Sequence, residues 1–178
     1  MPRNPNTVAV IDLGTNSIRL DIHRLHAGSA TVLHREKQMV RLGEGLFPDR
    51  KLRSHAVART IEALRTFRAP LELHQVGRVF AFATSAVREA TNRADFLKKA
   101  LREAGIRIRV LSGTQEARWI AGAIQKRERI RGNAALIDIG GGRTKNLLCL
   151  PRTGRPAPSL PLGVGRPARG HLIRDPPT

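Results

Sequence analysis

The segment TVAVIDLGTNSIRLDIHRL, residues 7–25, carries the clearest structural pattern in the chain. Residues 7–13 form a continuous apolar and β-branched run around one aspartate, which is typical of a buried strand. Gly14-Thr15-Asn16-Ser17 supplies a turn signal. Residues 18–25 then alternate between apolar and polar side chains, as a half-buried strand does. We therefore expect two antiparallel strands joined by a tight turn, with residues 31–39 as a weaker candidate for a third strand.

Beyond this opening the sequence first predicts a helix. Ser54 is a plausible N-cap, the helix runs through Phe67, and Pro70 is expected to stop it. Its apolar face is predicted to contain Val57, Ala58, Ile61 and Leu64.

Strand and helix patterns alternate in the rest of the chain. A short apolar strand is predicted at 76–82, and Asn92 is expected to cap a helix that ends at Ala104 before Gly105. A strand at 106–111, a helix at 115–126 and a strand at 133–139 complete the order β-β-β-α-β-α-β-α-β, which indicates a mixed α/β domain. Residues 151–178 hold seven of the eleven prolines and read as an incomplete continuation.

The composition favours a folded protein with polyanionic partners. The chain has 178 residues, 40% of them hydrophobic, and a formal net charge of +18. Arginine is spread along the whole sequence and there is no tyrosine, so a dedicated nucleic-acid role is disfavoured. The sequence has no run of about 18 apolar residues for a membrane span. The polar N-terminus lacks the apolar region of a signal peptide, so we expect a cytoplasmic protein.

Two strand-ending loops share a form that suits phosphate. Each has an apolar strand, an aspartate, glycine and a hydroxyl residue, in the segments Asp12-Leu13-Gly14-Thr15-Asn16-Ser17 and Asp138-Ile139-Gly140-Gly141-Gly142-Arg143-Thr144. Glycine lets backbone N–H groups approach phosphate oxygens, and a carboxylate can hold Mg²⁺ or a water. Either loop alone is an ordinary strand-to-turn motif. Two copies favour a cleft that clamps a phosphoanhydride.

Two further segments place charged side chains after strands. Arg88 follows the strand at 76–82 and is well placed to bind phosphate, although an ordinary surface arginine is an equal alternative. Glu116 lies in the first turn of the helix at 115–126. Helix capping is the ordinary explanation for it, and a water-orienting base is the functional one.

In their order along the chain these segments resemble the Ppx/GppA phosphatase family of exopolyphosphatases and guanosine pentaphosphate phosphohydrolases. The resemblance covers residue 7 to the C-terminus and rests on six segments: Asp12–Leu20, Arg41–Gly45, Ala83–Ala90, Ser112–Arg118, Asp138–Gly142 and Leu160–Gly163. It implies the actin-like, ribonuclease-H-like ATPase fold, with two lobes around a cleft.

The resemblance also implies roles for individual positions. Glu116 matches the catalytic glutamate that activates the attacking water, and Arg88 matches the arginine that binds the phosphate chain. Asp138 matches a carboxylate of the Mg²⁺ and water network, and Asp12 is expected to support the same centre. The residues whose amides line the phosphate site are matched by Gly14, Thr15, Asn16, Ser17, Gly140, Gly141 and Gly142.

The implied reaction is in-line attack of water on a terminal phosphoryl group of inorganic polyphosphate or guanosine pentaphosphate (pppGpp). The implied cofactor is Mg²⁺, and members of the family often form homodimers.

This chain departs from the family pattern at two places. The family's second loop usually continues with serine, a variable residue and glutamate, whereas this chain has Arg143 and Lys145 at the serine and glutamate positions. A protonated lysine cannot ligate a metal, so weaker Mg²⁺ binding is expected. The chain also stops at Thr178, so we expect a first lobe at 1–128 and only the truncated beginning of a second lobe at 129–178.

Two alternatives to a phosphohydrolase remain open at the level of sequence. One is a catalytically inactive fragment that binds polyanions through Arg88, Lys145 and its positive surface. The other is an ATP-using relative with the same fold, such as a sugar kinase. It is disfavoured because the adenine-binding part of those proteins lies in the second lobe.

Overall fold

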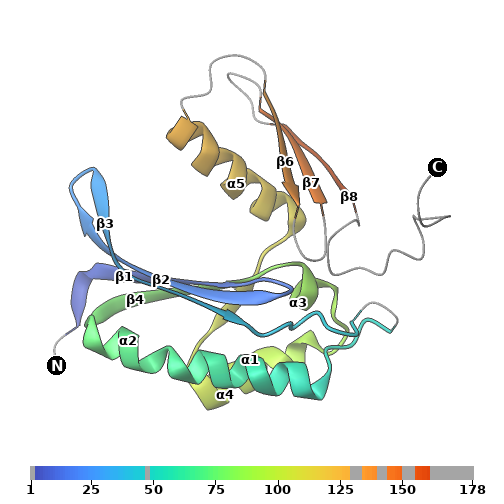
Figure 1. Ribbon diagram of the computed structural model, residues 1–178, viewed down its shortest axis with the longest axis horizontal. Helices are drawn as coiled ribbons and strands as arrows, with labels where there is room; N and C mark the ends of the chain where they lie inside the picture. Colours follow the sequence, from blue (N-terminus) through green and yellow to red (C-terminus); the bar gives the residue numbers. More distant parts are fainter. Residues whose placement is uncertain (1–2, 47–48, 129–133, 140–143, 150–154, 161–178) are drawn as a thin grey trace.

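The computed structural model describes residues 3–46, 49–128, 134–139, 144–149 and 155–160. Within these ranges the elements occur in the order β-β-β-α-α-β-α-α-β-α-β-β-β. The strands form one five-stranded and one three-stranded sheet (Figure 1).

The five-stranded sheet has the strand order β3-β2-β1-β4-β5. Its strands are β1 (Asn4–Leu13), β2 (Ser17–His26), β3 (Ser29–Met39), β4 (Val76–Ala83) and β5 (Ile108–Val110). The pairs β1–β2 and β2–β3 are antiparallel, whereas β1–β4 and β4–β5 are parallel. The predicted antiparallel opening and mixed sheet are therefore confirmed, including the third strand.

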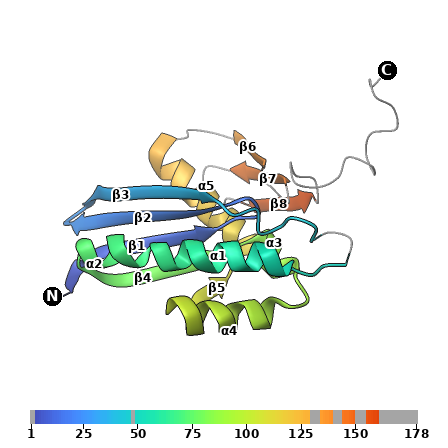
Figure 2. The ribbon, with the colours of Figure 1, turned by 60° about the horizontal axis from the view of Figure 1, so that its bottom comes forward.

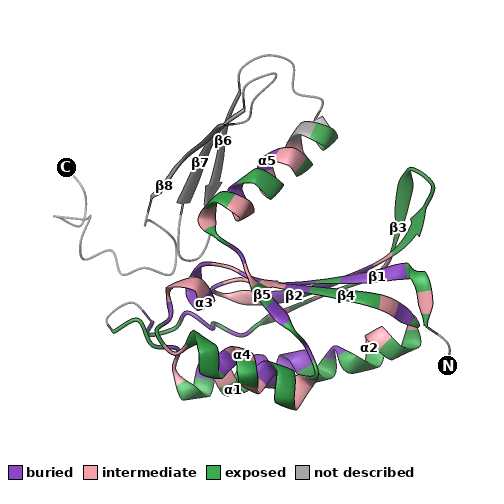
Figure 3. Cartoon of the chain, turned by 180° about the vertical axis from the view of Figure 1, so that it is seen from behind, coloured by how far each residue is buried: buried purple, intermediate pink, exposed green. Residues whose placement is uncertain are grey.

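One face of this sheet carries the core. Ala9, Ile11 and Leu13 are buried, while Val10 and Asp12 between them are exposed. This period of two arises because successive strand residues point to opposite faces. The buried face is covered by α1 (Ser54–Thr66), α2 (Arg68–Leu73) and α4 (Arg93–Ala104), and buried positions gather where these helices meet the strands (Figures 1 and 3).

The first helix differs from the prediction in three details. Arg53, with no side-chain cap, is the N-cap of α1, and Ser54 is already helical. Ile61 and Leu64 are buried as predicted, but Ala58 is exposed. Pro70 does not end the helical region, because it lies in the first turn of α2, where a missing N–H costs no hydrogen bond.

Both predicted ends of α4 are confirmed in position, but Asn92 does not cap the helix with its side chain. Gly105 is the C-cap, with φ +69° in the left-handed region that glycine tolerates. Asn92 is the N-cap residue, but its side chain makes no cap hydrogen bond. Instead, Asn92 accepts from the Leu52 N–H at 2.9 Å and donates to the Leu52 carbonyl at 3.0 Å, so it joins α4 to the chain ahead of α1.

On the other side of the sheet lie α5 (Gly113–Glu128) and the second sheet (Figure 2). That sheet pairs β6 (Ala134–Ile139), β7 (Thr144–Cys149) and β8 (Arg155–Leu160) in antiparallel order. Trp119 on α5 meets Phe82 on β4 edge to face, with ring centroids 4.9 Å apart. In the part of the chain that is described, no helix has the length and apolarity needed to cross a bilayer.

Candidate phosphate site at the ends of three parallel strands

Three parallel strands end at one edge of the first sheet, and a loop with candidate residues follows each. β1 ends at Leu13, β4 at Ala83 and β5 at Val110. In open α/β sheets ligands bind beyond the carboxyl ends of such strands. Thr84 donates its N–H to the Leu13 carbonyl at 3.1 Å, and Leu111 donates its N–H to the Ala83 carbonyl at 2.9 Å. The three loops are therefore joined directly to one another.

The turn between β1 and β2 is tied to the loop after β4. The Oγ1 of Thr15 and the Oγ of Ser85 are 2.9 Å apart and buried. Ser85 begins the short helix α3 (Ser85–Glu89), which the sequence did not predict as a helix. The Thr15 hydroxyl is thus engaged within the protein, and its position fixes the turn relative to α3.

Only some of the backbone N–H groups in the same turn donate hydrogen bonds. Gly14 donates its N–H to the Ser17 carbonyl at 3.0 Å. Among the described residues, neither the Thr15 N–H nor the Asn16 N–H has an acceptor within hydrogen-bonding distance. Of the four residues predicted to line a phosphate site here, Thr15 and Asn16 are therefore the ones whose amides have no hydrogen-bond acceptor among the described residues, and we call these the open amides.

Arg88 and Glu116 form the least exposed ion pair among the described side chains. Arg88 Nη1 lies 3.1 Å from Glu116 Oε2, with side-chain exposures of 17% and 11%. The same Nη1 donates to the Leu111 carbonyl at 2.8 Å. The two residues implied by the family resemblance are thus brought together, and Arg88 is no ordinary surface arginine.

At the start of α5 the side chain that caps the helix comes from Gln115, not from Glu116. Ser112 Oγ accepts from the Gln115 N–H at 3.1 Å, and Gln115 Oε1 accepts from the Ser112 N–H at 3.1 Å. This reciprocal pair is a capping box. Because Gln115 supplies its side chain to the cap, the Glu116 carboxylate can lie against Arg88 instead.

The predicted metal ligands lie on different sheets. Asp12 is exposed near the end of β1, and Asp138 lies on β6, where it pairs in register with Lys145 on β7. Gly140, Gly141, Gly142 and Arg143 lie outside the described residues. Among the side chains described, no three or more of histidine, cysteine, aspartate and glutamate form a metal-binding group. Mg²⁺ is commonly held by one or two carboxylates together with substrate phosphates, so Asp12 alone is compatible with it.

The loop after β3 packs against the candidate site, and sequence reasoning assigned it no role. The N–H groups of Val40 and Arg41 donate to the Asn16 carbonyl at 3.1 and 2.8 Å. Gly43 donates to the Thr15 carbonyl at 2.8 Å, and a Cβ at Gly43 would collide with Thr15 Cγ2. Beside this contact is a pocket of about 260 Å³ lined by Thr15, Asn16, Met39, Arg41, Gly43 and Glu44.

Comparisons with known proteins show the family to which the chain belongs. A sequence profile described as the Ppx/GppA phosphatase family matches residues 21–178. Exopolyphosphatase 2 of Mycobacterium tuberculosis is 38% identical over 153 residues, which are 79% of this chain and 47% of that protein. The solved Ppx/GppA family member of Aquifex aeolicus is 30% identical with a TM-score of 0.80, covering 97% of this chain and 56% of that chain. An exopolyphosphatase structure from Cytophaga hutchinsonii is 29% identical with a TM-score of 0.82, covering 88% and 51%.

The mixed sheet and these neighbours define a protein of the actin-like ATPase fold. The chain belongs to the Ppx/GppA phosphatase family. It spans about half the length of the exopolyphosphatase relatives it matches.

Proposed function

We propose that the chain hydrolyses terminal phosphoanhydride bonds and releases orthophosphate from inorganic polyphosphate, or converts pppGpp to ppGpp. The observation that carries this proposal is the Arg88–Glu116 pair, which lies where the loops after β1, β4 and β5 meet. The family membership supports the same reading.

The geometry suggests a division of labour during hydrolysis. The open amides of Thr15 and Asn16 suit the terminal phosphate, and Arg88 supplies a cation for the charge that spreads over its oxygens. Glu116 accepts a proton from the attacking water as the new P–O bond forms. The bond from phosphorus to the bridging oxygen breaks, and the shortened chain leaves with that oxygen.

Mg²⁺ is the proposed cofactor, with Asp12 and Asp138 as the residues that would hold it. A bound Mg²⁺ would neutralise charge on the phosphate oxygens. Asp12 lies next to the β1–β2 turn, which supports its assignment. We also propose that residues 1–128 form the first lobe and residues 129–178 the beginning of a second, in keeping with the two sheets.

Phosphate release from long-chain polyphosphate, with and without Mg²⁺, tests the proposal. Glu116→Gln keeps the size of the side chain and an acceptor for Arg88 but removes the base. Loss of a general base typically costs about 10²–10⁴-fold in rate. Glu62→Gln is the matched control, because Glu62 is an exposed carboxylate on α1. Equal rates in the unmodified chain and Glu116→Gln would contradict the proposed mechanism.

A second candidate is a polyphosphate-binding protein without turnover. It is favoured by the register that pairs Asp138 with Lys145, since a cation there opposes metal binding at that aspartate. Lys145→Glu distinguishes the two candidates. If the unmodified chain binds polyphosphate without releasing phosphate and Lys145→Glu restores Mg²⁺-dependent release, the binding function is correct for this chain.

A further inference from the structure

The pocket beside the β1–β2 turn has walls that are held in place from several sides. Residues 40–46 follow β3, and three of their N–H groups bond the carbonyls of Thr15 and Asn16. Arg53 donates its Nε to the Gly45 carbonyl at 2.9 Å. Arg59 on α1 donates its Nε to the Val40 carbonyl at 3.1 Å. The loop is thus fixed both to the turn and to the start of α1.

The negative charge of the one carboxylate that lines the pocket, Glu44, is balanced by an ion pair with Arg59. Glu44 Oε2 accepts from Arg59 Nη2 at 2.6 Å, and His55 Nε2 lies 3.7 Å away. The hydrogen bond from Arg59 holds the pKa of Glu44 below its ordinary value, with smaller contributions from the charges of Arg59, His55 and Arg41. Glu44 therefore stays ionised and paired, and it does not make the pocket repel anions.

The one cation that lines the pocket is held in an unusual backbone conformation. Arg41 has φ +46°, in the left-handed region that side chains other than glycine and asparagine rarely adopt. Its N–H bonds Asn16 and its carbonyl accepts from the Glu44 N–H at 3.0 Å. Its side chain is exposed, and among the described residues no carboxylate lies within ion-pair distance of its guanidinium. Residues in such conformations persist where the surrounding structure fixes them, often at binding sites.

We propose that this pocket is a second anion subsite, in which Arg41 binds a phosphate group of the polyphosphate chain beyond the one held at the Thr15 and Asn16 amides. The proposal rests on the proposed function, because it extends the same site along the substrate. Thr15 and Asn16 also line the pocket, so the two phosphate positions are neighbours. The planar guanidinium can donate two parallel hydrogen bonds to one phosphate.

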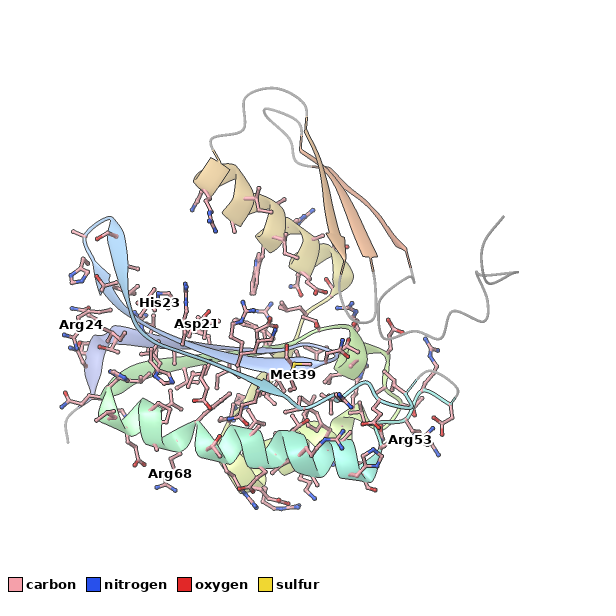
Figure 4. The ribbon with its side chains drawn as sticks, in the orientation of Figure 1. Asp21, His23, Arg24, Met39, Arg53 and Arg68 are labelled. Carbon is pink, nitrogen blue, oxygen red and sulfur yellow. The ribbon has the colours of Figure 1, made fainter. Side chains whose placement is uncertain are left out.

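The test compares a short with a long ligand. Binding of orthophosphate and of long-chain polyphosphate is measured by calorimetry on the full chain carrying Glu116→Gln, so that the long ligand is not consumed. Arg41→Asn removes the charge while keeping a residue that tolerates positive φ. Arg24→Asn is the control. It removes the same charge from an exposed position at the opposite end of the β2–β3 hairpin from Met39 (Figure 4).

With Arg41→Asn, long-chain affinity should fall about tenfold or more, as for a lost charge-assisted hydrogen bond. Orthophosphate affinity should be unchanged by Arg41→Asn, because one phosphate fills only the site at the Thr15 and Asn16 amides. Arg24→Asn should bind both ligands normally, and Arg41→Lys should recover part of the loss. An equal loss in Arg24→Asn, or an equal loss for orthophosphate, would overturn the subsite. Normal binding of both ligands by Arg41→Asn would overturn it while leaving the proposed function standing. Failure of the chain with Arg41 intact to bind either ligand would refute the proposed function as well.

Discussion

Arg88 Nη1 donates to both the Leu111 carbonyl and the Glu116 carboxylate, so one side chain sets the distance between the end of β5 and the first turn of α5. An ion pair shielded from water on both sides holds its geometry better than an exposed one. At the scale of the residue, this contact fixes Glu116 relative to the end of β5 and places the Arg88 guanidinium at the edge where the three loops meet.

The first prediction concerns Arg88→Lys, which keeps the charge but has no planar guanidinium to bridge two acceptors. We expect phosphate release to fall by roughly tenfold or more, since charge-assisted hydrogen bonds of this kind contribute about 1.5–3 kcal/mol. Release assays on Arg88→Lys and on the control Arg102→Lys check this. Arg102 is a largely exposed arginine of α4. Equal rates in both variants would show that geometry at Arg88 is unimportant.

The second prediction concerns the buried hydroxyl pair of Thr15 and Ser85. Thr15→Val keeps the shape of the side chain but leaves the Ser85 hydroxyl without this partner, which should cost about 1–3 kcal/mol of unfolding free energy. In the double variant Thr15→Val/Ser85→Ala the cost should be smaller than the sum of the single variants. Urea denaturation of the four proteins measures this coupling, and strictly additive costs would argue against the hydrogen bond.

At the scale of the element, α1 and α4 lie side by side on the sheet and are joined by one carboxylate. Arg65 on α1 reaches Glu103 on α4, with Nη2 3.1 Å from Oε2 and Nε 3.3 Å from the Glu103 carbonyl. The hydrogen bond from Arg102, helped by the charges of Lys99, Arg102 and Arg65, holds the pKa of Glu103 below its ordinary value of 4.5.

The third prediction follows from the direction of that shift. A carboxyl group whose pKa is lowered by folding adds stability above its unfolded pKa and loses it as the pH falls through the folded value. Glu103→Gln should therefore weaken the acid dependence of the melting temperature below about pH 4.5, the ordinary value. Thermal melts from pH 3 to 7 compare this variant with Glu62→Gln. If the melting temperature falls equally with decreasing pH in both variants, Glu103 has no such role.

How far the sequence predicts these elements depends on how local their causes are. The alternation in β2 and the glycine stop of α4 are local, and their predictions are confirmed. The continuous apolar run at 7–13 was expected as a buried strand, whereas β1 exposes Val10 and Asp12. Asn92 was predicted as a capping side chain, but its bonds to Leu52, forty positions away, belong to tertiary structure. The continuation of helical structure through Pro70 was also missed, since proline was read only as a terminator.

In the candidate site, too, some features could be predicted from the sequence and others depend on tertiary contacts. Arg88 and Glu116 were predicted through the resemblance, and the structure places them in contact, although their catalytic roles stay predictions. The support that Arg53 and Arg59 give to residues 40–46 was missed. Nothing in the sequence distinguishes these two arginines among 32 basic residues.

At the scale of the whole molecule, one face of the first sheet and the edge at which β1, β4 and β5 end differ in what they contain. One face is covered by α1, α2 and α4 and provides the stability of the fold (Figure 1). The edge beyond β1, β4 and β5 gathers the loops with the open amides, Arg88 and Glu116. With a formal net charge of +18, the whole chain attracts polyanions, so a local site must be distinguished from diffuse attraction.

A titration of the ¹⁵N-labelled chain with pyrophosphate, followed by amide NMR shifts in moderate salt, makes this distinction most directly. The site described above predicts saturable shifts centred on the amides of Thr15 and Asn16, with smaller ones from Thr84 to Arg88. Shifts that follow exposed arginines such as Arg24 and Arg68, without saturation and without effect on Thr15 and Asn16, would contradict it.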